Sequence, residues 1–233
     1  MNIQRFDYAR AEYYSLSISD LYDYLFGSCY QYLQKIGIKN ATEYLQGWKT
    51  LLERGLSFKS LMIPKSESGQ IYSQILFPKT PYELRMSFSV SILDSRFCLD
   101  NAQKVILSPR TKELRWIWTD SGIDFESLYR PQNPKPIYLC RLPLVIGEYQ
   151  YILVDGNHRL AAMQKYGYTQ EALLFDVRST YASIMGEFER VFFAFLVDFD
   201  NFIKNENPSH YKNLLWTRPL YKFVQSDLVS KGV

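Results

Sequence analysis

Side chains that could bind ions or move protons come together at residues 155–159, which read Asp-Gly-Asn-His-Arg. They directly follow the apolar run YILV at residues 151–154, and this pattern predicts a strand that turns into a helix. The first backbone N–H groups of a helix have no partner within it, and the helix dipole adds positive charge there. The segment therefore predicts a site for an anion.

These five residues suit a phosphate group in particular. Gly156 lets an oxygen come close to the backbone, and Arg159 offers a planar set of donors. Asn157 and His158 add further donors. Asp155 could hold a metal ion beside the phosphates or act as a general base, and His158 could act as a general acid. We therefore predict that the segment binds a phosphorylated ligand, of which nucleotides are the commonest.

A turn without any ligand is the alternative interpretation. Asp155 or Asn157 would then cap the helix, His158 would be half exposed, and Arg159 would pair with a nearby carboxylate. However, the dipole disfavours a positive side chain in the first turn of a helix unless an anion lies beside it. The position of Arg159 in the first turn therefore favours the phosphate site.

The elements around the segment must hold it in place. Two β-rich runs, at residues 137–146 and 149–154, predict an antiparallel hairpin. Residues 157–166 predict a helix that ends at Gly167, and residues 172–177 predict a further strand. The segment thus belongs to a unit made of strand, strand, turn, helix and strand.

Helices are predicted on either side of this unit. Apolar residues recur at helical spacing over residues 17–36 and 41–54, where Gly37 and Gly55 would end two helices of a hairpin. Residues 180–204 predict one long amphipathic helix that covers the sheet. Both flanks would serve mainly for packing.

Shorter patterns fill the part between. The alternation in MSFSVSIL, residues 86–93, predicts a half-buried strand, and KVIL at residues 104–107 predicts another. LMIP at 61–64 and QILF at 74–77 are weaker strand candidates, and FESLYR at 125–130 predicts a short helix. Together with the flanking helices, these patterns predict an α+β fold.

Composition excludes several classes of protein. The 27 basic and 24 acidic side chains are mixed along the 233 residues, so there is no charged tail of the kind that binds nucleic acid. The three cysteines are far apart and only two histidines are present, which gives no zinc framework and favours a cytoplasmic protein. We expect no secretory signal, because the N-terminal stretch MNIQRFDYARAEYY lacks an apolar region. We expect no membrane span, because the longest apolar run, residues 191–197, is too short to cross a bilayer.

The stretch VDGNHRLAAMQKYGY, residues 154–168, followed by a strand, resembles the phosphate-binding segment of the ParB/sulfiredoxin superfamily. Members carry a strand, a Gly-x-x-Arg turn and an Ala-containing helix. In the chromosome-partition proteins called ParB this turn binds the phosphates of CTP. The resemblance implies that residues 156–159, namely Gly156, Asn157, His158 and Arg159, contact the phosphates of a nucleotide. It covers residues 104–178 and is sharpest over 151–168.

The resemblance to sulfiredoxin itself implies a difference in chemistry. Sulfiredoxin has Gly-Gly-Cys-His-Arg at this place, so that Asp155 and Gly156 match its two glycines and Asn157 stands where its catalytic cysteine would be. Because the thiol nucleophile is missing, we do not expect repair of cysteine sulfinic acid.

The resemblance also implies an architecture. We expect a ParB/sulfiredoxin-like α+β domain with a mixed sheet at residues 58–178. An N-terminal helical extension, residues 1–57, would precede it, and a C-terminal helical extension, residues 179–233, would pack on the same core. Arg110 lies where relatives place further nucleotide contacts, although a surface position without a ligand is its simpler interpretation.

Two functions follow as expectations. The first is an enzyme that acts on phosphate bonds with ATP or CTP and Mg²⁺. It would hydrolyse a nucleotide or nucleic acid, as an NTPase or nuclease does, or transfer a phosphoryl group to a small acceptor, as a small-molecule kinase does. The second is a non-catalytic module that binds a nucleoside di- or triphosphate and thereby switches its contact with a protein or DNA partner. The absence of a helix-turn-helix pattern and the modest charge disfavour sequence-specific DNA recognition.

Overall fold

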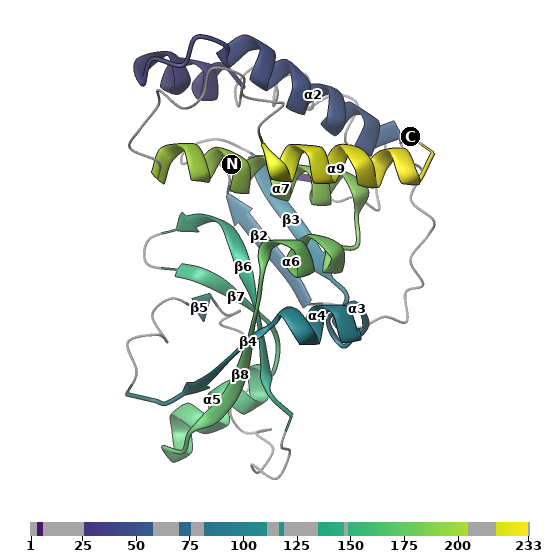
Figure 1. Ribbon diagram of the computed structural model, residues 1–233. Helices are drawn as coiled ribbons and strands as arrows, with labels where there is room; N and C mark the ends of the chain where they lie inside the picture. Colours follow the sequence, from purple (N-terminus) through teal and green to yellow (C-terminus); the bar gives the residue numbers. More distant parts are fainter. Residues whose placement is uncertain are drawn as a thin grey trace. The chain divides into compact units, whose positions relative to one another are not determined.

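Two compact units divide the described part of the chain (Figure 1). The computed structural model describes residues 4–6, 26–57, 70–75, 82–110, 117–118, 135–146, 149–204 and 218–232. We call the first unit the helical unit; it comprises Met1–Ile63, Ser73–Met86 and Gly186–Val233. The second is the α+β unit, which comprises Pro64–Tyr72 and Ser87–Met185.

A five-stranded mixed sheet forms the centre of the α+β unit, and its strand order is β4-β8-β6-β7-β5. The predicted hairpin is confirmed, because β6 and β7 pair antiparallel; β8 runs parallel to β6, and β5 runs parallel to β7. β4 pairs antiparallel with β8 and lies at one edge. The strands are β4 (Gln103–Leu107), β5 (Ile117–Trp118), β6 (Ile137–Ile146), β7 (Tyr149–Asp155) and β8 (Gln170–Phe175).

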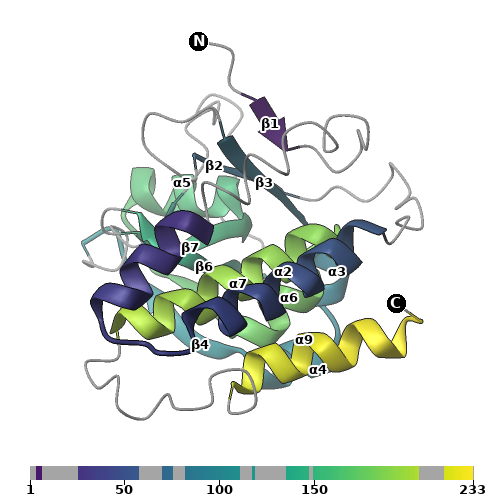
Figure 2. The same cartoon turned by 90° about the horizontal axis from the view of Figure 1, so that it is seen from above.

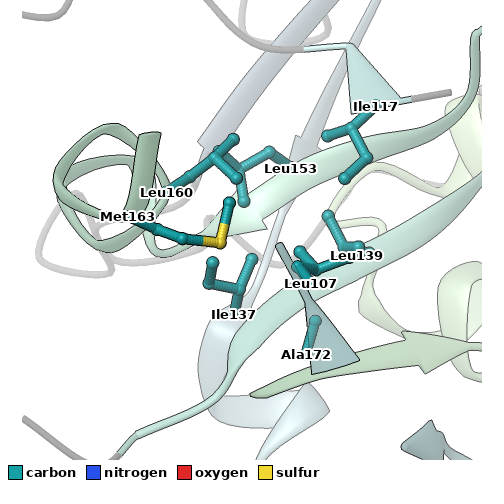
Figure 3. Packing of buried hydrophobic residues seen from close by; sticks show 8 residues of the cluster. All are labelled: Leu107, Ile117, Ile137, Leu139, Leu153, Leu160, Met163 and Ala172. Atoms are coloured by element: carbon teal, nitrogen blue, oxygen red, sulfur yellow. The ribbon is translucent and has the colours of Figure 1, made fainter. Parts of the chain in front are cut away.

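Helix α5 (Asn157–Tyr166) covers one face of this sheet. Its Leu160 and Met163 pack against Ile137 and Leu153 of the hairpin, as Figure 3 shows. Each fully buried side chain of this kind contributes about 1.5–3 kcal/mol through the hydrophobic effect. This packing fixes the helix, and hence its first turn, on the end of β7.

The opposite face of the sheet packs against a second group of helices, α3 (Val90–Leu93), α4 (Arg96–Asn101) and α6 (Val177–Ser183). Cys140 of β6 points to this side and contacts Thr180 and Ser183 of α6. Side chains of successive strand residues point to opposite faces, so Tyr138 lies on this side too, while Ile137 faces α5. The α+β class is therefore confirmed for this unit.

Helices from the two flanks of the sequence pack together in the helical unit. They are a helix at residues 26–35, α2 (Ala41–Ser57), α7 (Glu187–Lys204) and α9 (Pro219–Ser230), and Figures 1 and 2 show α2, α7 and α9 side by side. Fully buried aromatic side chains of α2 and α7 pack in this unit: Tyr44, Trp48, Phe188, Phe192 and Phe195. The flanks thus share a hydrophobic core of their own, which we did not predict.

A buried carboxylate joins three of these helices. Asp198 of α7 accepts hydrogen bonds from the Tyr44 hydroxyl at 2.8 Å and from Trp48 Nε1 at 3.3 Å, both on α2. Arg218, at the start of α9, donates from Nε to Asp198 Oδ1 at 2.8 Å. Burial, and next the charge of Asp198, raises the pKa of Tyr44 well above its ordinary value. The network therefore satisfies a charge that would be costly to bury alone.

A small three-stranded sheet completes the described elements. Its strands are β1 (Gln4–Phe6), β2 (Gln70–Ile75) and β3 (Tyr82–Phe88), in the order β1-β3-β2, and β1 runs parallel to β3. β2 overlaps only the first two residues of the predicted QILF strand. The candidates at 61–64 and 125–130, and residues 17–25 of the first predicted helix, lie outside the described residues.

The prediction that Gly55 ends a helix is wrong, because α2 continues to Ser57. A Cβ atom at Gly55 would lie 3.3 Å from Phe188 Cα and 3.3 Å from Val191 Cγ2. The glycine therefore lets α2 and α7 approach closely in the middle of a helix. By contrast, Gly37 does end the helix at 26–35, with a φ of 82°.

Two further predictions are corrected by local hydrogen bonds. The strand predicted at 86–93 ends at Phe88, because the Ser89 side chain accepts from Ile92 N and caps α3. The long helix predicted at 180–204 is two helices, since α6 ends at Ser183 and α7 begins at Glu187. At the break Ile184 forms a β-bridge with Phe88, and Ser89 N donates to Ser183 O at 2.8 Å.

The cysteines are buried as free thiols: Cys29, Cys98 and Cys140. Burial raises the pKa of Cys29 and of Cys140 to about 12, so both stay protonated at neutral pH. Within the described ranges, no helix is both long and apolar enough to span a membrane.

Candidate anion-binding site at the start of helix α5

The predicted strand–turn–helix at residues 155–159 is present. β7 ends at Asp155, Gly156 takes the left-handed conformation with φ 104° and ψ 23°, and α5 begins at Asn157. The first helical hydrogen bond runs from Leu160 N to Gly156 O at 2.8 Å. Because Gly156 is the N-cap, the first turn of α5 has no side-chain cap. A bound anion is an alternative acceptor for backbone amides at such a helix start.

An ion pair closes this turn on one side. Arg159 donates from its terminal nitrogen to Asp155 Oδ2 at 2.7 Å, with 14% of the arginine side chain and 40% of the aspartate side chain exposed. A Cβ atom at Gly156 would lie 3.1 Å from Arg159 Nε and 3.0 Å from Ile137 Cγ1. The guanidinium thus occupies the space that a side chain at position 156 would need. Gly156 is required for this contact as well as for its backbone conformation.

The ion pair bears on the two interpretations of the turn. An arginine paired with a nearby carboxylate is what the ligand-free turn predicts, although here Gly156 and neither Asp155 nor Asn157 is the cap. Asp155 takes one hydrogen bond from Arg159, whereas a guanidinium has five N–H donors. Asp155 therefore fixes the direction of the guanidinium while leaving donors that an anion can use.

Asn157 and His158, which lie between Gly156 and Arg159, differ in exposure. His158 is exposed and faces solvent, so a ligand can reach its ring. Asn157 is half-buried, and its Oδ1 atom is buried. Of the two, His158 is the better placed to donate a proton to a bound group.

Tyr138 and Asp94 also lie at the site, and neither was predicted from the sequence. Tyr138 lies opposite Asp155 in the β6–β7 pair, and its hydroxyl donates to Asp94 Oδ1 at 2.5 Å. Its ring packs edge-on against Phe175 at 5.2 Å. Burial raises the pKa of Tyr138, the hydrogen bond and charge of Asp94 and the charge of Asp155 raise it further, and Arg159 opposes them. The four side chains thus form one electrostatic group.

Irregular pairing explains why Tyr138 was missed. Counting back from the hairpin turn, where Ile146 pairs with Tyr149, would place Asp155 opposite Cys140. The register shifts between Arg141 and Ile146, and again next to Leu139, so that Asp155 meets Tyr138 instead. The second shift leaves Val154 as an extra residue directly before Asp155. Bulges of this kind redirect side chains and are common beside functional sites.

The structure does not bring Arg110 to this group. Arg110 is exposed in the turn after β4, where its backbone N–H bonds to Ser108 Oγ at 3.3 Å. Strands β8 and β6 lie between β4 and β7, which separates β4 from β7 by about 14 Å at the usual strand spacing. A contact between Arg110 and the ligand stays a prediction.

The residues offer limited support for a metal ion. Among the described residues, no group of three or more His, Cys, Asp and Glu side chains is arranged to hold one. Asp155 could supply one carboxylate oxygen, and Mg²⁺ in nucleotide sites often takes only one or two carboxylates beside phosphates and water. A magnesium ion here would therefore depend on the phosphates of its ligand.

Comparisons with protein-family models, with curated proteins and with solved structures found no match. The residues at the start of α5 are therefore the basis for assigning a function. The group that they form combines uncapped helix amides, a guanidinium held in one direction and an exposed imidazole. Such a combination can bind a doubly charged oxyanion.

Proposed function

We propose that this protein binds the phosphates of a nucleoside di- or triphosphate at the start of α5, as a ParB/sulfiredoxin-like domain. One observation carries the proposal: the first turn of α5 is uncapped, and the Arg159 guanidinium lies across Gly156 beside it. Backbone amides and an arginine in this arrangement are a common means of binding phosphate. The exposed His158 adds a donor at the same turn.

Asp155 has a supporting part in this binding. Its carboxylate holds Arg159 at 2.7 Å and so limits the rotamers of a long side chain before the ligand arrives. Ordering a flexible side chain beforehand lowers the entropy lost on binding. The Asp155–Arg159 pair and a phosphate site are therefore compatible with each other.

The proposed reaction is cleavage or transfer at a phosphate bond. His158 would donate a proton to the leaving group, and Asp155 would accept one from water or from a small hydroxyl acceptor. Mg²⁺ bound with the nucleotide would supply charge neutralisation at the phosphates. Nucleotide hydrolysis, cleavage of nucleic acid and phosphoryl transfer to a small molecule are the three forms of this activity.

A non-catalytic switch is the second candidate, and the ion pair favours it. A phosphate that draws Arg159 toward itself would leave the half-exposed Asp155 carboxylate without its partner. This change in charge at the end of β7 could alter a surface that a protein or DNA partner contacts. Turnover of the nucleotide is not needed for such a mechanism.

Calorimetric titration with ATP, CTP, GTP and ADP, each with and without Mg²⁺, tests binding. We expect Arg159→Ala to weaken the affinity for the bound nucleotide at least about tenfold, because a hydrogen bond to a charged group is lost. Arg96→Ala is the matched control, since its side chain is 94% exposed in the same unit. If the wild type binds none of these nucleotides, the proposed function is wrong.

Product analysis then separates the two candidates. The protein is incubated with the nucleotide that binds, with Mg²⁺, and with single- and double-stranded DNA and RNA. Released phosphate, cleaved strands or a new phosphorylated molecule, all lost in His158→Ala, would support the enzyme. Binding without any product would support the switch.

A further inference from the structure

The group around Asp155 continues on the face of the sheet that is opposite to α5. Tyr138 is the cross-strand neighbour of Asp155, and side chains in such pairs point to the same face with Cβ atoms about 5 Å apart. Tyr138 is 7% exposed, so its ring has little freedom beside the carboxylate. The ring is therefore in a position to restrict the rotamers of Asp155.

Two contacts fix the tyrosine ring itself. Its edge packs on Phe175 with an angle of 73° between the ring planes. Its hydroxyl donates to Asp94 Oδ1, at the C-terminal end of α3. Asp94 itself is exposed, so water could solvate its carboxylate without this hydrogen bond. The main effect of this hydrogen bond is therefore to hold the tyrosine ring in place, because water can supply hydrogen bonds to Asp94.

We infer that Tyr138 is a positioning residue of the site at the start of α5: anchored by Asp94, its ring keeps the Asp155 carboxylate turned toward Arg159. The inference rests on the proposed function, because it says how that site is held ready for a phosphate. It also explains the register shift at Val154, which brings Asp155 opposite Tyr138 rather than Ile137. The raised pKa of Tyr138 agrees with it, because the hydroxyl stays protonated and can donate to Asp94.

The direct test observes Arg159 without any ligand. In an NMR spectrum of arginine side chains, the Arg159 Nε–H signal is assigned by its loss in Arg159→Lys. We expect Tyr138→Phe and Asp94→Ala each to shift this signal and to speed its exchange with water severalfold. Asp94→Asn keeps a side-chain acceptor for the hydroxyl and should leave the signal close to that of the wild type.

A matched control and a double variant complete this test. Tyr168→Phe removes a hydroxyl from a tyrosine packed against the α5 side of the core, and it should leave the Arg159 signal unchanged. Tyr138→Phe combined with Asp94→Ala should change the signal no more than either variant alone, because both break the same contact. A merely structural role would lower the melting temperature and leave the Arg159 signal in place.

Nucleotide affinity provides the second readout. We expect Tyr138→Phe and Asp94→Ala to weaken binding about threefold to tenfold, with Asp94→Asn and Tyr168→Phe within twofold of the wild type. An Arg159 signal that does not move in Tyr138→Phe or Asp94→Ala overturns the inference, whatever the protein binds. Failure of the wild type to bind nucleotides while the signal moves would instead refute the proposed function alone.

Discussion

The Asp198–Arg218 pair of the helical unit and the Asp155–Arg159 pair of the α+β unit join the same two side-chain types at 2.6 Å and 2.7 Å. Both arginines lie at the start of a helix, where their charge is disfavoured by the helix dipole. In each case the aspartate compensates for that charge. The surroundings of the two pairs differ.

Asp198 is saturated with donors, whereas Asp155 is not. Tyr44, Trp48 and Arg218 all donate to Asp198, and Arg218 also donates to its backbone oxygen at 2.7 Å. The Asp198 side chain is 3% exposed, while 40% of the Asp155 side chain is exposed. A saturated, buried pair can only hold elements together, but a pair with spare donors at an uncapped helix can also exchange partners. The difference separates a structural ion pair from a candidate binding site.

Removing the buried carboxylate should have the largest effect. Asp198→Ala leaves the Arg218 charge and two α2 donors buried without their acceptor, and we expect a loss of about 3–5 kcal/mol in the free energy of unfolding. Urea denaturation followed by circular dichroism measures it. A loss below about 1 kcal/mol would mean that the network does not hold the three helices.

Replacing the glycines at the two ends of α5 tests how closely Arg159 approaches Gly156. Gly156→Ala should cost about 1–3 kcal/mol, because φ is 104° and the new Cβ would meet Arg159 and Ile137. Gly167→Ala is the matched control: its φ is 78°, but no atom lies within 4 Å, so only about 1 kcal/mol of backbone strain is expected. Equal costs in denaturation experiments would argue against the close approach of Arg159.

Each pair also has a tyrosine whose pKa is raised, which makes stability depend on pH. Tyr44 and Tyr138 stay protonated in the folded protein above their ordinary pKa of 10.0, while the unfolded chain loses these protons. Stability is therefore fully present below pH 10 and falls as pH rises beyond it, by up to about 1.4 kcal/mol per pH unit for each tyrosine. Unfolding measured between pH 9 and 11.5 should show a shallower fall in Tyr44→Phe and in Tyr138→Phe. An unchanged slope in both variants would contradict the burial of these hydroxyls.

We expect the smallest change in the free energy of unfolding when the carboxylate of the candidate site is removed. Asp155→Ala should lower the free energy of unfolding by less than about 1 kcal/mol, because partly exposed ion pairs contribute little. Denaturation of this variant beside Asp198→Ala measures the contrast between the two pairs directly. A loss similar to that of Asp198→Ala would mean that both pairs serve only the fold.

Patterns among residues close together in the sequence were enough to predict the strands, turn and helix that form the site. The β6–β7 hairpin and α5, ended by Gly167 with a φ of 78°, follow from local periodicity and from the need for glycine in a left-handed cap. Gly156 and the turn around it were predicted for the same reason. These features depend on contacts over a few residues, which a single sequence displays.

Features that depend on distant residues were not predictable in this way. The alternation of serine and apolar residues at 86–93 fits a strand, but Ser89 can also cap a helix. In the structure Ser89 caps α3, and its backbone N–H donates to the oxygen of Ser183, which is distant in sequence. Gly55 looks like a helix end until α7 packs against it. Asp94 and Tyr138 are 44 positions apart, and only the irregular pairing of β6 with β7 brings Tyr138 to Asp155.

The bridge between Phe88 and Ile184 fastens together the two ends of the stretch Ser87–Met185. The backbone thus leaves and re-enters this cassette through adjacent residues, a geometry found where one domain has been inserted into another. Because its two ends are adjacent, we expect this cassette to tolerate insertion into a surface loop of an unrelated host. The proposed phosphate site would travel with it, since each of its side chains lies between the two fastened ends.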